Sequence, residues 1–134
     1  MKVNVKKATK GNALVVKPGK IPFVKHMTLC YDELYEIVQG SLEIVPFIID
    51  GEDFALVLNQ DRDICGFPYN RTFCFDHTSK DYCKIAGTFM IVGHTRHLEI
   101  IGLSESRIRY FKKLLYECSK EDFENDKYEI MLSY

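Results

Sequence analysis

The chain has 134 residues, of which 46% are hydrophobic, 13% aromatic and 28% charged, and its formal net charge is −1. These values suit one domain with an ordinary core and exclude a disordered chain. The balanced charge gives no global signature of a nucleic-acid-binding protein. Residues 1–31 nevertheless contain seven Lys and no Asp or Glu, so the remaining residues together carry −8. We therefore expect a single domain, residues 1–134, that begins basic and continues acidic.

Targeting signals are absent from the pattern. Lys2, Lys6 and Lys7 resemble a basic leader, but the apolar run that follows, residues 13–16, is too short for a signal peptide. No run approaches the ~18 apolar residues of a membrane span. Five Cys without a CxxC pair are typical of reduced thiols. We expect a cytoplasmic protein that does not enter a membrane.

The first part of the chain predicts a hairpin followed by a short helix. Residues 1–12 form a Lys-rich extension or edge strand, and residues 13–16 and 21–27 predict two strands joined by a Pro-Gly turn. Thr28 is expected to cap the helix, and Gly40 to end it. One apolar stripe of this helix is expected to comprise Tyr31, Leu34, Tyr35 and Val38, a spacing typical of core residues.

The middle of the chain predicts strands and one long aperiodic stretch. Residues 42–49 predict an edge strand because Pro46 lies within it. Residues 54–58 predict the next strand, and a turn at 60–63 should close a hairpin back to residues 64–66. The aperiodic stretch covers residues 67–84. Residues 84–92 predict the central strand, interrupted by a single Gly that marks a bulge or a close backbone approach.

The C-terminal part predicts a strand at 98–101 and a helix capped by Ser104. Its buried face is expected to contain Ile108, Phe111, Leu114, Leu115 and Cys118, and its water-facing side Arg107, Arg109, Lys112 and Lys113. Residues 117–134 form an acidic tail in which 128–132 predict a last strand. The pattern as a whole predicts an α+β fold: a mostly antiparallel sheet of five to seven strands with two helices.

Several short segments in a fixed order carry a family resemblance. They are residues 13–20 (ALVVKPGK), 34–42, 55–59 (ALVLN), 66–71 (GFPYNR), 85–89 (IAGTF) and 103–104. In this order they resemble the family called domain of unknown function 3846, over a core of residues 13–116. The resemblance implies an origin in a bacteriophage, plasmid or other mobile element and a bacterial host cytoplasm, and it implies no established activity. The chain departs from the family pattern at a single Gly40, where paired glycines are common, and at residues 60–63, where a Gly-bearing turn is common.

Polar side chains around the loop after residue 58 form the candidate ligand site. Asn59, Asn70 and Arg71 combine a planar fork of donors with amides that both donate and accept. If Thr88 and the backbone of Gly87 lie beneath them, the set could hold a small anionic ligand such as a nucleotide. The alternative is structural: the two Asn satisfy turn backbone, and Arg71 pairs with an Asp of residues 61–63.

A metal site and a thiol nucleophile are the weaker alternatives. Cys74, His77, Cys83, His94 and His97 allow a mixed zinc site to be drawn, but neither pair has standard spacing. A Cys nucleophile would need an adjacent His, and a free Cys is more often a small buried hydrophobe. We expect no metal site, no cofactor and no catalytic residues.

These observations favour a small non-enzymatic binding protein that blocks a host process, with counter-defence as the natural setting. Its partner would be a small anionic ligand or a host protein. The alternatives are a nucleic-acid-associated protein that uses Lys6, Lys7 and Lys10 of its basic N-terminal part, which the acidic remainder disfavours, and an enzyme acting on a nucleotide. An exposed edge strand also predicts a homodimer formed by sheet extension.

Overall fold

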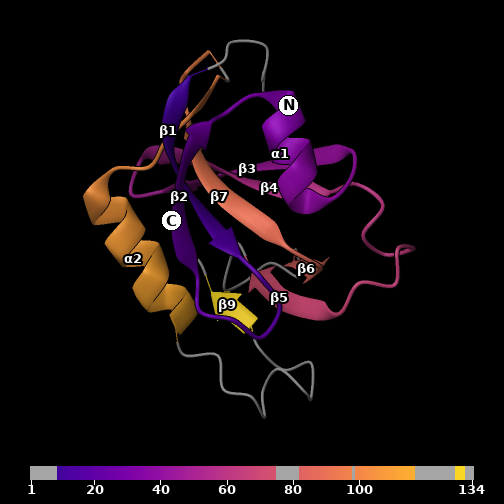
Figure 1. Cartoon of the computed structure of the whole chain (residues 1–134). Helices are drawn as coiled ribbons and strands as arrows, with labels where there is room; N and C mark the ends of the chain where they lie inside the picture. The colour runs from indigo at the N-terminus through magenta and orange to yellow at the C-terminus, as the bar shows by residue number, and fades with distance from the viewer. Residues whose placement is uncertain (1–8, 75–81, 98, 117–128, 132–134) are drawn as a thin grey trace.

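The computed structural model describes residues 9–74, 82–97, 99–116 and 129–131. They form an α+β fold around a six-stranded antiparallel sheet with the order β2-β1-β7-β4-β3, in which β8 also pairs with β7 (Figure 1). A second sheet has the order β6-β5-β9. The elements are β1 (Lys10–Val16), β2 (Phe23–Thr28), α1 (Tyr31–Val38), β3 (Leu42–Ile49), β4 (Glu52–Asn59), β5 (Tyr69–Cys74), β6 (Tyr82–Ala86), β7 (Phe89–His94), β8 (Ile100–Ile101), α2 (Glu105–Tyr116) and β9 (Glu129–Met131). The predicted fold class is confirmed.

The central strands of the main sheet, β1, β7 and β4, contain continuous buried runs and are covered on both faces, which explains their apolar sequences. In β1, Ala13 and Val15 face the core on the α1 side, while Leu14 and Val16 face the core that contains α2 and the second sheet. On the α2 side, Phe111 packs edge-on against Phe54 with a centroid distance of 5.1 Å. The order of layers is therefore α1, main sheet, then α2 together with the second sheet.

The predicted hairpin is present as β1–β2, and its turn is well defined. The Lys20 N–H donates to the Lys17 carbonyl over 3.1 Å, and Gly19 adopts φ +66°, which a side chain would resist. β2 ends the strand order on one side and β3, which contains Pro46, ends it on the other. Both edge positions agree with the placement of Pro22 immediately before β2 and of Pro46 within β3.

Helix α1 buries fewer side chains than predicted. Leu34 and Val38 are buried, but Tyr31 and Tyr35 are each 44% exposed, so the prediction of four core residues is wrong for the two Tyr. An eight-residue helix rests on the sheet through one i, i+4 pair, and side chains flanking that pair reach solvent. The N-cap is Cys30 rather than Thr28, and its side chain makes no capping hydrogen bond.

The predicted strand at residues 84–92 is two strands in different sheets. β6 ends at Ala86 and β7 begins at Phe89, which is central in the main sheet as expected. Between them Gly87 has φ +81°, and a Cβ built there would lie 2.7 Å from Cδ2 of Phe67. The glycine therefore marks a change of sheet rather than a bulge.

The region from 60 to 84 also differs from the prediction. Residues 60–66 form successive turns without a strand, so the hairpin to residues 64–66 is wrong. The stretch read as aperiodic, 67–84, contains β5 and the start of β6. Residues 75–81 lie outside the described part of the chain.

The C-terminal elements follow the prediction closely. β8 and β9 are present, and β9 runs parallel to β5. The N–H of Arg107 donates to the Ser104 hydroxyl, and Ile108, Phe111 and Leu115 are buried. Arg107 does not simply face water, because it pairs with Glu52 at 2.9 Å. Cys118, most of the acidic tail and residues 1–8 of the Lys-rich extension lie outside the described residues. Neither described helix has the length and apolar character needed to cross a membrane.

Candidate functional site

A groove of about 490 Å³ opens between the β1–β2 hairpin and the C-terminal part of α1. Helix α1 contacts β3, β4 and β7, and its Leu34 and Val38 share a buried cluster with Ala13 and Val15 of β1, so the groove opens beside this packed region. The volume is that of a typical small-ligand site. The lining residues are Val15, Lys17, Pro18, Lys20, Phe23, Lys25, Glu36, Ile37, Gln39, Pro68 and Thr88.

Strand register places the basic and aromatic side chains on the groove face. Val15 pairs with Phe23, and Ala13 pairs with Lys25, so these side chains share the face toward α1. Lys17 follows Val15 by two residues and continues that face. All three side chains are exposed at the groove, so solvent and a ligand can reach Lys17, Phe23 and Lys25 from this face.

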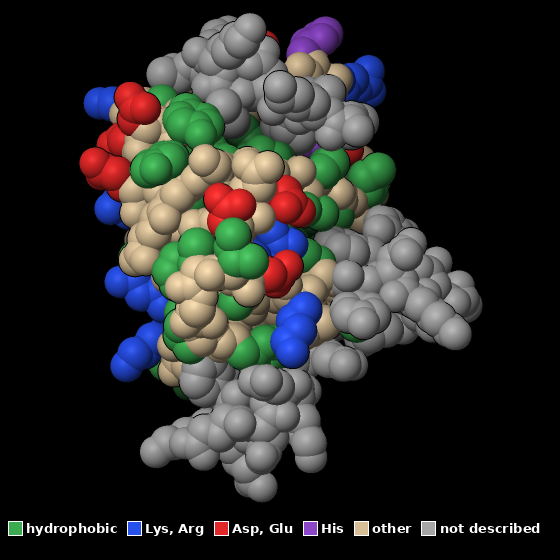
Figure 2. Space-filling model, turned by 90° about the vertical axis from the view of Figure 1, so that its right-hand side faces the viewer, with side chains coloured by type: hydrophobic (Ala, Val, Ile, Leu, Met, Phe, Trp, Pro, Cys, Tyr) green, Lys and Arg blue, Asp and Glu red, His purple; other side chains and the backbone are tan. Residues whose placement is uncertain are grey.

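The groove is positively charged. Three lysines line it, at positions 17, 20 and 25, against one carboxylate, Glu36. Within the described residues no acidic side chain comes within ion-pair distance of any of the three. Phe23 is 41% exposed, and the Lys17 ammonium lies 5.7 Å from its ring centroid. Figure 2 shows basic side chains at intervals along one edge of the molecule, with acidic side chains beside the upper ones. Such a site suits an anion that also carries a flat ring.

Of the predicted ligand residues, Thr88 lines the groove and Asn59 lies elsewhere. The Asn59 side chain is buried at the end of β4. Its amide donates to the carbonyls of Val38 and Gln39 over 3.0 and 3.1 Å, and its oxygen accepts from the N–H of Asp61 over 2.7 Å. Asn59 thus ties the C-terminus of α1 to the loop after β4.

The structure brings Asn70 and Arg71 together on β5, and both are fully buried. The Arg71 Nη1 donates to Asn70 Oδ1 over 2.6 Å, and Nη2 donates to the carbonyls of Lys20 and Leu115 over 3.2 and 3.4 Å. The Asn70 amide donates to two further carbonyls. These contacts differ from the alternative expectation of an ion pair with Asp61 or Asp63. Direct ligand binding by Asn59, Asn70 and Arg71 stays a prediction.

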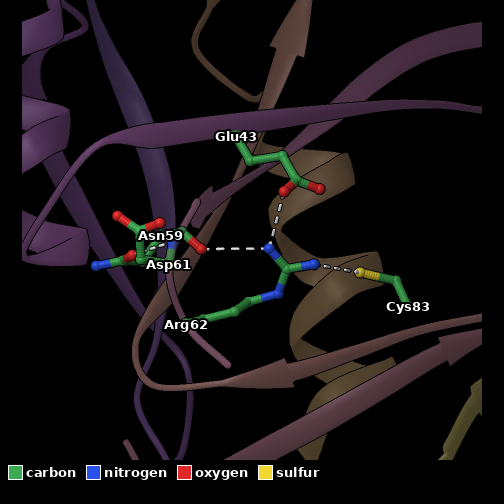
Figure 3. Close-up of polar contacts among 5 residues, drawn as sticks. All are labelled: Glu43, Asn59, Asp61, Arg62 and Cys83. Carbon is green, nitrogen blue, oxygen red and sulfur yellow. Dashed lines mark hydrogen bonds and ion pairs between the residues drawn. The ribbon is translucent and has the colours of Figure 1, made fainter. Parts of the chain in front are cut away.

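A second polar cluster surrounds Arg62 (Figure 3). Its Nη1 pairs with Glu43 at 3.0 Å and contacts the Asn59 carbonyl at 3.2 Å, while Nη2 lies 3.9 Å from the Cys83 sulfur. Burial raises the pKa of the Cys83 thiol, and the adjacent Arg62 opposes this shift. Burial alone would lower the pKa of Arg62, but hydrogen bonding and charge attraction with Glu43 raise it overall. The thiol is therefore kept neutral and is a poor nucleophile, and the cluster acts as a tie between β3, the loop and β6.

Metal-binding geometry is not found in the described residues, where no three His, Cys, Asp or Glu side chains gather around one point. His94 is buried, with Nδ1 2.9 Å from the Thr95 carbonyl, and His97 is exposed. His77 lies outside the described residues.

The groove lysines were missed as a group by the search for ligand residues. Their signal in the sequence was the run of seven Lys without an acid in residues 1–31. The register of the β1–β2 hairpin, which places Lys25 and Phe23 on one face, is the second determinant of this grouping. The position of α1 over the neighbouring strands, which creates the groove, is not readable from local pattern.

Comparison with known proteins identifies the family but no characterised relative. No curated protein and no solved structure matches the chain. The family model for the domain of unknown function DUF3846 matches residues 10–116, which span every described element except β9. This match agrees with the resemblance carried by the short segments of the sequence. The chain therefore belongs to the DUF3846 family.

Proposed function

We propose that this protein is a small binding protein that captures an anionic ligand of the nucleotide class in the groove beside the β1–β2 hairpin. The observation that carries the proposal is the convergence of Lys17, Lys20 and Lys25, without ion-pair partners among the described residues, on a groove of about 490 Å³. Unneutralised ammonium groups around a concavity favour phosphate or carboxylate.

The rest of the groove suits the remainder of a nucleotide. Phe23 offers an exposed aromatic face on which a base can stack, and Thr88 offers a hydroxyl. Val15, Ile37 and Pro68 supply an apolar wall. Binding without turnover is the form we propose. The polar side chains on the groove are three Lys, one amide, one hydroxyl and the single carboxylate of Glu36, a set that suits holding an anion.

We further propose that the protein acts from a phage or mobile element within a bacterial host, where retention of a nucleotide signal would counter a host defence. The implied mobile-element origin motivates this setting. Occlusion of a host protein surface is the other mode within the same proposal, and the exposed Tyr31 and Tyr35 on α1 would suit such a contact.

The test is native mass spectrometry and calorimetry of the full chain with a panel of linear and cyclic nucleotides. The double variant Lys20→Ala/Lys25→Ala should bind the retained nucleotide about tenfold or more less tightly. Each lost charge contact is worth roughly a few-fold in affinity. The matched control is Lys112→Ala/Lys113→Ala, which removes the same charge from exposed positions of α2. Equal weakening by both variants would show general electrostatics instead of a site, and a cleaved product would identify an enzyme.

The second candidate, nucleic-acid association, is favoured by the same basic hairpin. It predicts an oligonucleotide affinity that falls steeply with salt and declines on neutralisation of Lys6, Lys7 and Lys10. No oligonucleotide binding near physiological salt would remove it.

A further inference from the structure

We infer that Asn70 and Arg71 form a buried clamp that positions the lysine-bearing wall of the groove, rather than contacting the ligand themselves. This inference rests on the proposed function, because it assigns positioning residues to the same groove. Both side chains are 0% exposed, and Arg71 is among the largest fully buried side chains described. Burial of a guanidinium and an amide is costly unless their donors are used.

Asn70 uses both hydrogens of its amide on the backbone beneath the groove. The Asn70 amide donates to the Val16 carbonyl over 3.0 Å and to the Gly87 carbonyl over 2.7 Å. Val16 immediately precedes Lys17, and Gly87 immediately precedes Thr88, two of the groove residues. One side chain therefore fixes the backbone beneath two walls of the groove at once.

Arg71 extends this clamp to the turn of the hairpin. Its Nη2 donates to the Lys20 carbonyl over 3.2 Å, and its Nη1 donates to Asn70 Oδ1 over 2.6 Å. The turn is closed internally by the Lys20 N–H to Lys17 carbonyl bond of 3.1 Å. The guanidinium thus holds one end of a turn that presents two of the three lysines.

The clamp also has a fixed base. Arg71 Nη2 lies 3.4 Å from the carbonyl of Leu115, in the last turn of α2, where a helix leaves carbonyls without intrahelical partners. The Gly87 N–H donates to the Pro68 carbonyl over 2.8 Å and joins one further lining residue, Pro68, to the segment that carries Thr88. The position of the hairpin turn is therefore fixed by hydrogen bonds to β5, which in turn bonds to α2 and to the segment before β7, and not by the hairpin alone.

Arg71→Lys tests the clamp without any ligand. It retains the positive charge but replaces the two-headed guanidinium with one ammonium. Amide hydrogen exchange should become at least about tenfold faster at Lys20, while the Leu56 amide in the core strand β4 keeps its rate, because only the turn is released. Arg109→Lys, at an exposed position of α2, is the matched control and should change neither amide. An unchanged Lys20 rate, or equal acceleration at Lys20 and Leu56, would overturn the clamp.

A double-mutant cycle with ADP as the probe tests its effect on binding. Arg71→Lys and Lys20→Ala should each lower the affinity for ADP. The double variant should bind ADP as tightly as the weaker-binding single variant, because both substitutions remove the same contact. A structural effect unrelated to the turn would make the two factors multiply, and that result would overturn the inference. If the wild type retains no nucleotide, the proposed function fails, while the exchange measurement still decides the clamp.

Wild-type protein provides the answer if Arg71→Lys does not fold. Slowly exchanging Nη protons of Arg71, with NOEs to the 17–20 turn, are expected from the hydrogen bonds to buried carbonyls. Rapidly exchanging Nη protons without such NOEs would overturn the clamp.

Discussion

Replacement of Asn59 by Ala should destabilise the protein strongly, because one buried side chain satisfies three backbone groups. Its amide donates to Val38 and Gln39 carbonyls at the end of α1, and its oxygen accepts from the Asp61 N–H. The side chain is 3% exposed, so water replaces these bonds poorly. Loss of a donor to buried partners costs about 1–3 kcal/mol for each group left unsatisfied. Because the Asp61 N–H lies on an exposed loop, we expect a total of about 3 kcal/mol, dominated by the two carbonyls.

Asn59→Asp separates donation from acceptance. Aspartate still accepts from Asp61 but cannot donate, and it brings a negative charge to the negative end of the α1 dipole. It should therefore be at least as unstable as Asn59→Ala. Gly40 supports this reading, because a Cβ built there would lie 2.6 Å from Nδ2 of Asn59, so the amide occupies the space that the missing side chain of Gly40 leaves.

The assay is urea unfolding followed by circular dichroism, with Asn12→Ala as the matched control. Asn12 makes one exposed side-chain hydrogen bond, at 2.9 Å to His26, so its removal should cost less than about 0.5 kcal/mol. An Asn59→Ala variant within this range of the wild type, or full stability of Asn59→Asp, would refute the reasoning. A stable Asn59→Ala variant that loses a retained nucleotide would instead support direct ligand contact.

Three further perturbations address other parts of the fold. Gly87→Ala should lower the free energy of unfolding by about 2 kcal/mol or more, and Gly51→Ala by about 1 kcal/mol. Both residues have positive φ, but only at Gly87 would the new Cβ meet a neighbour, Phe67, at 2.7 Å. Equal melting temperatures of the two variants would contradict this. Arg107→Ala should cost about 1 kcal/mol in low salt and less in 1 M salt, since its 2.9 Å pair with Glu52 is partly exposed; a salt-independent difference would exclude the pair as its cause. Because the pKa of Cys83 is raised in the folded protein, its stabilising contribution is complete below the ordinary thiol pKa and is lost as pH rises through the folded pKa. Urea midpoints under reducing conditions should fall more steeply from neutral to alkaline pH in the wild type than in Cys83→Ala, and parallel profiles would reject the link.

Elements that depend on local pattern were predictable from the sequence. The Pro-Gly turn after residue 16, the edge strand containing Pro46 and the buried stripe of α2 each follow from residues close together in the chain. The same holds for β9, which was expected at residues 128–132 and lies at Glu129–Met131. In these cases chain chemistry and tertiary environment favour the same conformation.

Features that depend on the assembly of distant segments were not predictable in the same way. The sequence predicted that Gly87 marks a bulge or a close approach within one strand, but the chain changes sheets there, and a Cβ at this position would meet the Phe67 ring. Arg71 looked like a surface donor because of its position after a turn-rich loop. Its burial follows from the packing of the hairpin turn and the end of α2 around β5, which joins segments 51 and 44 residues away.

The edges of the main sheet bear on how the groove can be reached. Exposed Lys25 and His26 lie on β2, and Pro46, which lacks an N–H, interrupts β3. Charged and proline residues on edge strands oppose pairing with another chain. These residues argue against sheet extension at the two edges of the main sheet, and the homodimer stays a prediction. Since Lys25 also lines the groove, the residue that protects the β2 edge is one that we propose binds the anion. A second subunit paired at this edge would lie beside the groove that we propose captures the ligand.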